Sequence, residues 1–239
     1  MENVTRRDFV RNSMAAGAAV ATAATSAGAA QGAASSEGTI KILAISCSPR
    51  QGKSTATALG VCLQAAKEVS PKIETELIEL AGLKINGSVA AGIPLAEGEQ
   101  DDFPKLVPKL ADPHVQGIIL GTPVYFGNMS SLCKAFLERC IVLYQPDYVL
   151  SNKAAGVVAV GGTRNGGQEA TIQSVQMSLF CQEMILVGNG RPGSRLGATV
   201  WSGAEGGVLK DEFGMTTTKT LGRRVAQIAL QLAGPARPA

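Results

Sequence analysis

Short apolar runs alternate with longer segments of helical periodicity through most of the chain. The runs are rich in Ile, Val, Leu and Ala and are bounded by Gly, Pro or charged residues, which predicts β-strands. They lie at residues 40–45, 73–80, 117–121, 154–160 and 184–187. Apolar positions spaced three and four residues apart predict helices at residues 55–69, 101–110, 131–143, 169–180 and 214–232.

Strands that alternate with helices predict an α/β fold with a doubly wound parallel sheet. The run at residues 117–121 is apolar throughout, as is typical of a central strand that is covered on both faces. Five strands suit the flavodoxin-like order 2-1-3-4-5. In such sheets a ligand binds at the carboxyl ends of the strands, beside the switch between strands one and three.

Two segments show neither strand nor helix periodicity. Residues 82–100 are rich in Gly and Ala, and residues 188–210 are rich in Gly and long enough to form a functional or intersubunit loop. The second segment contains Trp201, the single tryptophan, for which packing beneath the loop is favoured over a place beside a ligand.

A polar loop joins the first predicted strand to the first predicted helix. This arrangement gathers backbone N–H groups, hydroxyls and cations around one point at the helix N-terminus, which suits a phosphate. The hydroxyls favour a terminal monophosphate, as in FMN, because hydroxyls and amides can surround the dianion. The candidate phosphate-binding residues are Ser48, Arg50, Gly52, Lys53, Ser54 and Thr55.

Two other interpretations of this loop remain open. A Walker loop, GxxxxGK[ST], would need glycine five residues before Gly52, where the chain has Cys47. That mismatch weighs against a P-loop nucleotide binder. The other interpretation is an ordinary strand-to-helix turn in which a serine caps the helix, because capping favours the same residue types.

Two further loops follow the third and fourth predicted strands. The first has proline, two aromatics and glycine, which can lie flat against a planar ring, although a hydrophobic staple over the core remains open for the aromatics. The second has four glycines in seven residues, which allow close backbone approach to a ligand. Because the strands are parallel, all three loops are expected at one edge of the sheet. The residues of these two loops to which the family resemblance described below gives a role at the ring are Pro123, Val124, Tyr125, Phe126, Gly127, Asn128 and Met129, together with Gly162, Thr163, Arg164 and Gly167.

Length and composition fit one domain behind an export signal. The chain has 239 residues, 45% of them hydrophobic, and a formal net charge of +3. About 200 residues remain once residues 1–35, the expected leader, are set aside, and this number is enough for one α/β domain. No basic stripe interleaved with aromatics is present, so no nucleic-acid partner is expected.

The N-terminal residues resemble a twin-arginine export signal. The pair Arg6 and Arg7 precedes a weakly apolar run at residues 14–30 that is too short and Ala-rich for a membrane span. An Ala-rich extension with a chance arginine pair is the alternative. We assign residues 1–35 to the signal peptide and linker and residues 36–239 to the FMN-binding domain, and we expect export to the periplasm through the twin-arginine translocase.

Few residues of the chain suit protein-based catalysis. The five cysteines are scattered, with no CxxC pair, so neither a zinc site nor a disulfide framework is indicated. The single histidine follows a proline before the third strand, where a loop histidine is the favoured interpretation. We expect no metal ligand and no catalytic side chain, since the flavin N5 would carry the chemistry. The residues concerned are Cys47, Cys62, Cys133, Cys140, Cys181 and His114.

Four segments together resemble a known family. They are residues 48–55 (SPRQGKST), 121–136 (GTPVYFGNMSSLCKAF), 161–169 (GGTRNGGQE), and 196–201 with 221–225 (LGATVW and LGRRV). They resemble the flavodoxin-fold, NADPH-dependent FMN reductase family, and most closely its iron-sulfur flavoprotein branch. The resemblance implies that the first loop holds the FMN phosphate, that the other two border the isoalloxazine, and that the protein is a homodimer or homotetramer.

One segment departs from that branch. Iron-sulfur flavoproteins carry a compact four-cysteine motif after the second strand, but residues 85–103 contain no cysteine. We therefore expect no iron-sulfur cluster.

The sequence supports two hypotheses of function. The main one is an FMN-dependent oxidoreductase that passes electrons from NAD(P)H, or from a quinol or redox protein, to a quinone, a flavin or a similar small acceptor. The alternative is a non-enzymatic periplasmic flavodoxin-like electron carrier, because an exported protein would leave the cytoplasmic NAD(P)H pool.

Overall fold

The computed structural model describes residues 38–144 and 147–233 of the chain. The expected export signal and linker, residues 1–35, therefore lie outside the described residues. Within the described part, no helix has both the length and the apolar character needed to cross a membrane.

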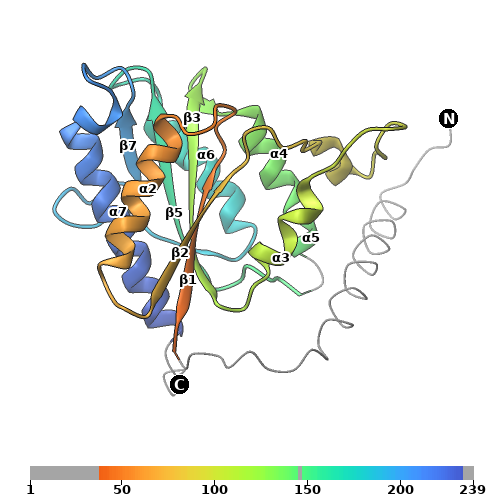
Figure 1. The fold of residues 1–239 in the computed structure, drawn as a ribbon, viewed down its shortest axis with the longest axis horizontal. Coiled ribbons are helices and arrows are strands. Elements are labelled where there is room, and N and C mark those ends of the chain that lie inside the picture. The colour runs from red at the N-terminus through yellow and green to blue at the C-terminus, as the bar shows by residue number, and fades with distance from the viewer. Residues whose placement is uncertain (1–37, 145–146, 234–239) are drawn as a thin grey trace.

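A parallel sheet forms the middle layer of the molecule (Figure 1). Its strands are β1 (Ile40–Ser46), β2 (Ile73–Glu79), β3 (Val115–Tyr125), β5 (Ala154–Gly161) and β6 (Ile185–Leu186), in the order β2-β1-β3-β5-β6. This arrangement confirms the flavodoxin-like order that the sequence predicts. All four neighbouring pairs along this path are parallel.

Helices cover both faces of the sheet. One face packs against α2 (Ser54–Lys67) and α7 (Glu212–Ala233). The other face packs against α3 (Val107–Leu110), α4 (Ser131–Arg139), α5 (Ile141–Tyr144) and α6 (Gln168–Phe180). β3 and β5 are buried along nearly their whole length, because side chains on both of their faces lie in one of these two layers.

The outermost strand is split, which the sequence does not predict. β6 pairs with the start of β5, at Ala154 and Ala155, whereas a further strand, β7 (Ala198–Trp201), pairs with its end. The prediction that residues 188–210 are irregular throughout is therefore wrong for residues 198–201. The β-branched residues of β7 complete the sheet beside β5, but glycines on either side hide this four-residue strand in the sequence.

Several smaller elements also differ from the expected ones. The helix expected at residues 101–110 is broken into a 3₁₀ turn, η2 (Phe103–Lys105), and α3, because Pro104 and Pro108 supply no N–H for regular bonding. The helix expected at residues 131–143 is divided into α4 and α5. Two more 3₁₀ turns, η1 (Gly87–Ala91) and η3 (Val208–Lys210), lie in the expected loops, and β4 (Asn128–Met129) folds back against the end of β3.

Helices α2 and α7 cross in close contact beside the sheet. A Cβ built on Gly222 would lie 2.1 Å from the carbonyl oxygen of Cys62. The Cys62 thiol donates to the carbonyl of Thr218 at 3.2 Å. The helix that follows the first loop is therefore fixed against α7 by backbone-to-backbone packing, which holds its N-terminus at one place above the sheet.

We predict that Gly222→Ala lowers the free energy of unfolding by about 2–3 kcal/mol, because the added methyl group meets backbone that cannot rotate away. Gly60→Ala on α2 is the matched control: its Cβ would meet no atom within 4 Å, and alanine favours a helix over glycine by up to about 1 kcal/mol. Urea denaturation followed by circular dichroism measures both. Equal midpoints for the two variants would contradict the close helix crossing.

Candidate functional site

The three glycine-bearing loops meet at the carboxyl edge of the sheet. They follow β1, β3 and β5, which are adjacent strands (Figure 1, top). The hydroxyl of Ser130, just after the second loop, donates to the carbonyl of Cys47 at 2.7 Å and accepts from the N–H of Cys133 at 3.1 Å. Its own N–H donates to the hydroxyl of Thr122 at 3.1 Å. One buried serine thus joins the start of the first loop to both ends of the second.

The third loop packs against the second. A Cβ built on Gly167 would lie 2.9 Å from the Cα of Gly127, and both glycines have positive φ, at 97° and 75°. An L-residue at either position would be strained, and at Gly167 it would also clash. The structure therefore brings the loops predicted to hold a ligand to one rim, as the topology requires.

The first loop leaves the N-terminus of α2 open. Ser48 is buried and its hydroxyl accepts from the N–H of Arg50 at 3.1 Å, which shapes the turn. The residue at the N-cap is Lys53, and no side chain caps the helix. The interpretation of this loop as an ordinary serine-capped turn is therefore wrong. The N–H groups of the first helical turn, beginning at Ser54 and Thr55, remain available to an anion.

Charge at the first loop also favours an anion. Arg50 and Lys53 are exposed, and neither has a carboxylate within 4.0 Å among the described residues. The first turn of α2 contains no acidic residue. One acidic group does reach the loop: Glu79, at the end of β2, accepts from the N–H of Gly52 at 2.8 Å. No local sequence pattern predicts this contact, because the two residues are 27 positions apart.

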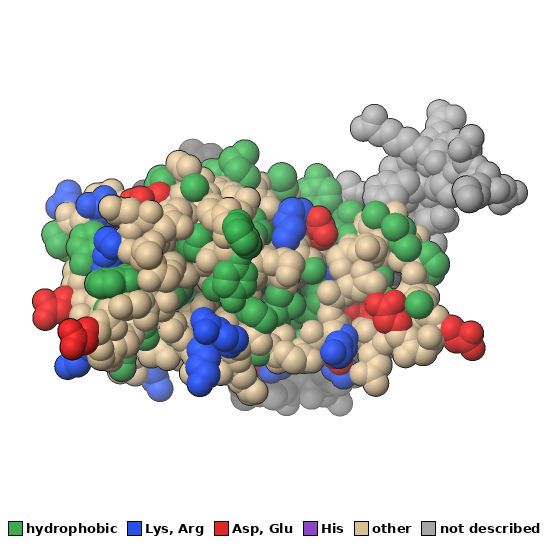
Figure 2. Space-filling model, turned by 90° about the horizontal axis from the view of Figure 1, so that it is seen from above, with side chains coloured by type: hydrophobic (Ala, Val, Ile, Leu, Met, Phe, Trp, Pro, Cys, Tyr) green, Lys and Arg blue, Asp and Glu red, His purple; other side chains and the backbone are tan. Residues whose placement is uncertain are grey.

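The second loop is a short hairpin that presents aromatic side chains to solvent. Val124 and Tyr125 pair with Met129 and Asn128 across β3 and β4. Phe126 has a φ of 50° and a fully exposed side chain, and Tyr125 is 42% exposed. Viewed onto the carboxyl edge, hydrophobic side chains gather in the middle of the face, with Lys or Arg side chains beside them (Figure 2). A staple over the core is thus excluded for Phe126.

Trp201 of β7 and Asp211, just before α7, form a hydrogen bond and an ion pair with the third loop. The indole N–H of Trp201 donates to the carbonyl of Gly162 at 2.9 Å, so this tryptophan contacts the third loop. Arg164 forms an ion pair with Asp211, whose side chain is 1% exposed. Asp211 also accepts from the N–H groups of Trp201 at 2.7 Å and Gly214 at 2.9 Å. Its carboxylate balances the positive charge of Arg164.

The cysteines and the histidine lie outside this site's chemistry. Cys47, Cys62, Cys133 and Cys140 are buried. Burial raises the pKa of the Cys47 thiol well above its usual range and also raises the pKa of Cys62 and Cys140, so these thiols are protonated and weakly nucleophilic. His114 is exposed before β3, at the opposite edge of the sheet, and contacts Asp112 at 2.9 Å. In the part of the chain with described coordinates, no three His, Cys, Asp or Glu residues are grouped as metal ligands.

Comparison with known proteins identifies the family. Residues 40–195 match the family model described as NADPH-dependent FMN reductase. The chain belongs to this family. It is therefore an FMN-dependent flavoprotein oxidoreductase.

Individual relatives agree with this assignment. An iron-sulfur flavoprotein from Methanocaldococcus jannaschii is 36% identical over 192 residues, covering 79% of this chain and 97% of the relative. An NAD(P)H dehydrogenase (quinone) from Aromatoleum aromaticum is 30% identical over 172 residues, covering 67% and 77%. Among solved structures, the flavodoxin, WrbA-like protein from Agrobacterium tumefaciens superimposes with a TM-score of 0.54 at 18% identity, covering 81% and 98%, which shows a shared fold.

The residues at the carboxyl edge fit FMN. A Cβ built on Gly52, Gly127 or Gly162, one in each loop, would meet no atom within 4 Å, so open space borders all three loops. The uncapped helix N-terminus and the two unpaired cations suit a phosphate, and the exposed aromatic hairpin suits a flat ring.

We predict that Ser130→Ala lowers the free energy of unfolding by about 2 kcal/mol. The substitution removes the cap of α4 and leaves the buried Cys47 carbonyl without its donor. Ser131→Ala is the matched control, because the next serine is exposed and makes no side-chain hydrogen bond. Chemical denaturation compares them. A loss of less than about 0.5 kcal/mol for Ser130→Ala would show that this serine does not join the loops.

Proposed function

We propose that FMN binds at the carboxyl edge with its phosphate at the N-terminus of α2. The observation that carries this proposal is the combination of an uncapped helix, two cations without carboxylate partners and a buried serine that shapes the loop. The residues that would hold the phosphate are Ser48, Arg50, Gly52, Lys53, Ser54 and Thr55.

The other two loops would hold the ring. The hairpin from Pro123 to Met129 offers backbone groups and exposed aromatic surface, while Gly162, Thr163 and Gly167 offer backbone that can approach closely. The Arg164–Asp211 ion pair would fix the third loop and present a balanced charge to the ring. When bound, FMN supplies hydride and electron transfer, so the chain's own task is to bind, orient and exclude water.

The electron acceptor that suits this site is a small planar oxidant. The site is open to solvent at an aromatic hairpin, which favours a quinone or a flavin that stacks on an exposed ring face. The name of the relative from Aromatoleum aromaticum, an NAD(P)H dehydrogenase (quinone), supports a quinone. We propose NAD(P)H as the donor, with a quinol or a redox protein in its place if the protein works in the periplasm.

We also propose that the protein lacks an iron-sulfur cluster. No cysteine lies in residues 85–103. This segment is instead held by a bidentate ion pair between Arg139 and Asp101, with N–O distances of 2.9 and 2.6 Å and exposed fractions of 5% and 11%. The Arg139 guanidinium also lies 4.8 Å from the centre of the Phe103 ring. These contacts order the segment without a metal.

We also propose an oligomeric state and a cellular location for the protein. The fully exposed Phe126 side chain, on a strained backbone at the rim, supports a homodimer or homotetramer in which a second copy covers the hairpin. The arginine pair Arg6 and Arg7 in the leader supports export to the periplasm by the twin-arginine translocase.

We predict that Lys53→Ala combined with Ser54→Ala raises the Kd for FMN at least about tenfold, since one charge-assisted phosphate bond contributes about 1.5–3 kcal/mol. Lys72→Ala combined with Ser70→Ala removes the same side-chain types in the turn before β2, at the opposite edge, and should leave the Kd unchanged. Quenching of flavin fluorescence measures both. An unchanged Kd in the first variant would refute the phosphate assignment.

The donor and acceptor are tested by anaerobic mixing of the FMN-loaded protein with NADPH or NADH, followed by addition of a quinone. We expect bleaching of the flavin absorbance by at least one nicotinamide and its return, with turnover, when the quinone is added. Failure of both nicotinamides to bleach the flavin would contradict the proposed donor and would favour the electron-carrier alternative.

A further inference from the structure

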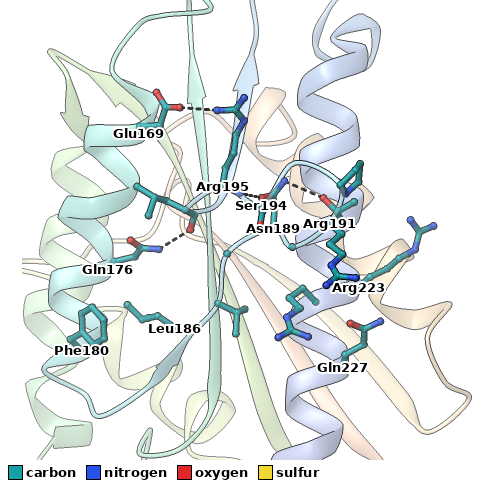
Figure 3. Close-up of a pocket in the computed structure, with 17 residues that line it drawn as sticks. Glu169, Gln176, Phe180, Leu186, Asn189, Arg191, Ser194, Arg195, Arg223 and Gln227 are labelled. Carbon is teal, nitrogen blue, oxygen red and sulfur yellow. Dashed lines mark hydrogen bonds and ion pairs between the residues drawn. The ribbon is translucent and has the colours of Figure 1, made fainter.

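The interruption of the outermost strand creates a large cleft away from the flavin edge. Residues 188–197 leave the sheet after β6 and return at β7, and the space between this loop, α6 and α7 is a cavity of about 1300 Å³ (Figure 3). None of the residues that the sequence assigns to FMN lines it. The cleft is larger than the 300–1000 Å³ typical of a pocket for one small ligand.

Positive charge from two segments, the loop between β6 and β7 and helix α7, converges on this cleft. Four of the lining residues are arginines, and only one is acidic, Glu169. Figure 3 shows Arg191 and Arg195 on the loop, and Arg223 on α7 with its side chain directed to the far side of that helix. The fourth arginine is Arg224, also on α7. Guanidinium groups stay charged at any physiological pH and match phosphate oxygens in pairs, so the cleft attracts anions.

Two of these charges are unbalanced. Arg223 lies 3.3 Å from Glu68, and Arg195 lies 3.9 Å from Glu169. Arg191 and Arg224 have no carboxylate within 4.0 Å in residues 38–144 and 147–233. Like charges held close together repel each other, and an anion between them would remove that repulsion.

The loop that carries the arginines is rigidly built. Asn189 is 1% exposed; its side-chain oxygen accepts from the N–H of Arg195 at 2.5 Å, and its side-chain N–H donates to Thr220 at 3.3 Å. A Cβ on Gly188 would lie 2.2 Å from the Arg195 carbonyl oxygen. From α6, the Gln176 side chain donates to the Leu196 carbonyl at 2.8 Å. These contacts fix the course of the loop and join it to α6 and α7.

The remaining lining residues suit the body of an organic ligand. Phe180, Leu186 and Pro192 supply apolar surface, and Gln176 and Gln227 supply amide groups. We propose that this edge cleft binds a small organic diphosphate of nucleotide size, with Arg191 and Arg224 on the phosphates and the apolar side chains against the organic body. The proposal is independent of where FMN binds.

Isothermal titration of the FMN-saturated full chain with ADP, adenosine and pyrophosphate tests it. We expect ADP to bind with a Kd below about 1 mM, adenosine and pyrophosphate each at least tenfold more weakly, and ADP affinity to fall as salt is raised. If pyrophosphate binds as tightly as ADP, the apolar surface contributes nothing to the affinity, and the proposal of an organic ligand is wrong. Absence of ADP binding, or release of FMN by ADP, would overturn the site.

Arg191→Gln combined with Arg224→Gln should weaken ADP binding at least tenfold. The matched control is Lys105→Gln combined with Lys134→Gln, which removes two exposed cations that do not line the cleft. This variant should bind ADP with the affinity of the unmodified protein. Equal ADP affinity in both variants would refute the role of the arginines. If the arginine variant does not fold, Gln227→Glu adds a negative charge to the cleft and should cause the same loss, while unchanged binding would count against the proposal.

Discussion

The unsatisfied N–H groups at the start of α2 are the feature on which the functional account depends. The first N–H groups of a helix are bonded by a capping side chain, by water or by a ligand. Ser130 caps α4, whereas no side chain among the described residues caps α2. The partial positive charge of the helix end therefore adds to that of Arg50 and Lys53. The close crossing of α2 with α7 holds α2 in place beside the sheet, so the proposed anion site would be preformed.

The rest of the carboxyl edge is arranged around that point by the parallel sheet. Because β1, β3 and β5 are neighbours and run the same way, their loops can only end at the same rim. Ser130 and the Gly127–Gly167 contact then fix the spacing of these loops. A site built this way needs few chemical groups of its own, which agrees with the absence of a catalytic histidine and with thiols whose pKa values are raised by burial.

Much of this arrangement could be predicted from the sequence because it is local. Apolar runs such as residues 117–121 mark the central strands, and the glycines of residues 161–167 mark a loop that approaches a ligand. Contacts between distant positions could not be predicted in the same way. Asp211, which pairs with Arg164, lies 47 residues along the chain, and β7 is recognisable as a strand only once β5 stands beside it.

The split of the outermost strand has further consequences that the spacing of hydrophobic residues in the sequence does not predict. The loop between β6 and β7 forms the edge cleft, and its Arg195 lies 5.3 Å from the centre of the Phe213 ring. Arg164 of the flavin loop lies 5.3 Å from the same ring. Phe213 therefore stands between the loop that carries Arg195 and the loop that carries Arg164.

The central claim is that the protein recognises its flavin through the phosphate at the N-terminus of α2. Parallel titrations of the flavin-free protein with FMN and with riboflavin, which differ only in that phosphate, test it most directly. The account predicts that FMN binds at least about a hundredfold more tightly than riboflavin, as two or more charge-assisted phosphate bonds would give. Equal affinities for the two flavins would contradict it.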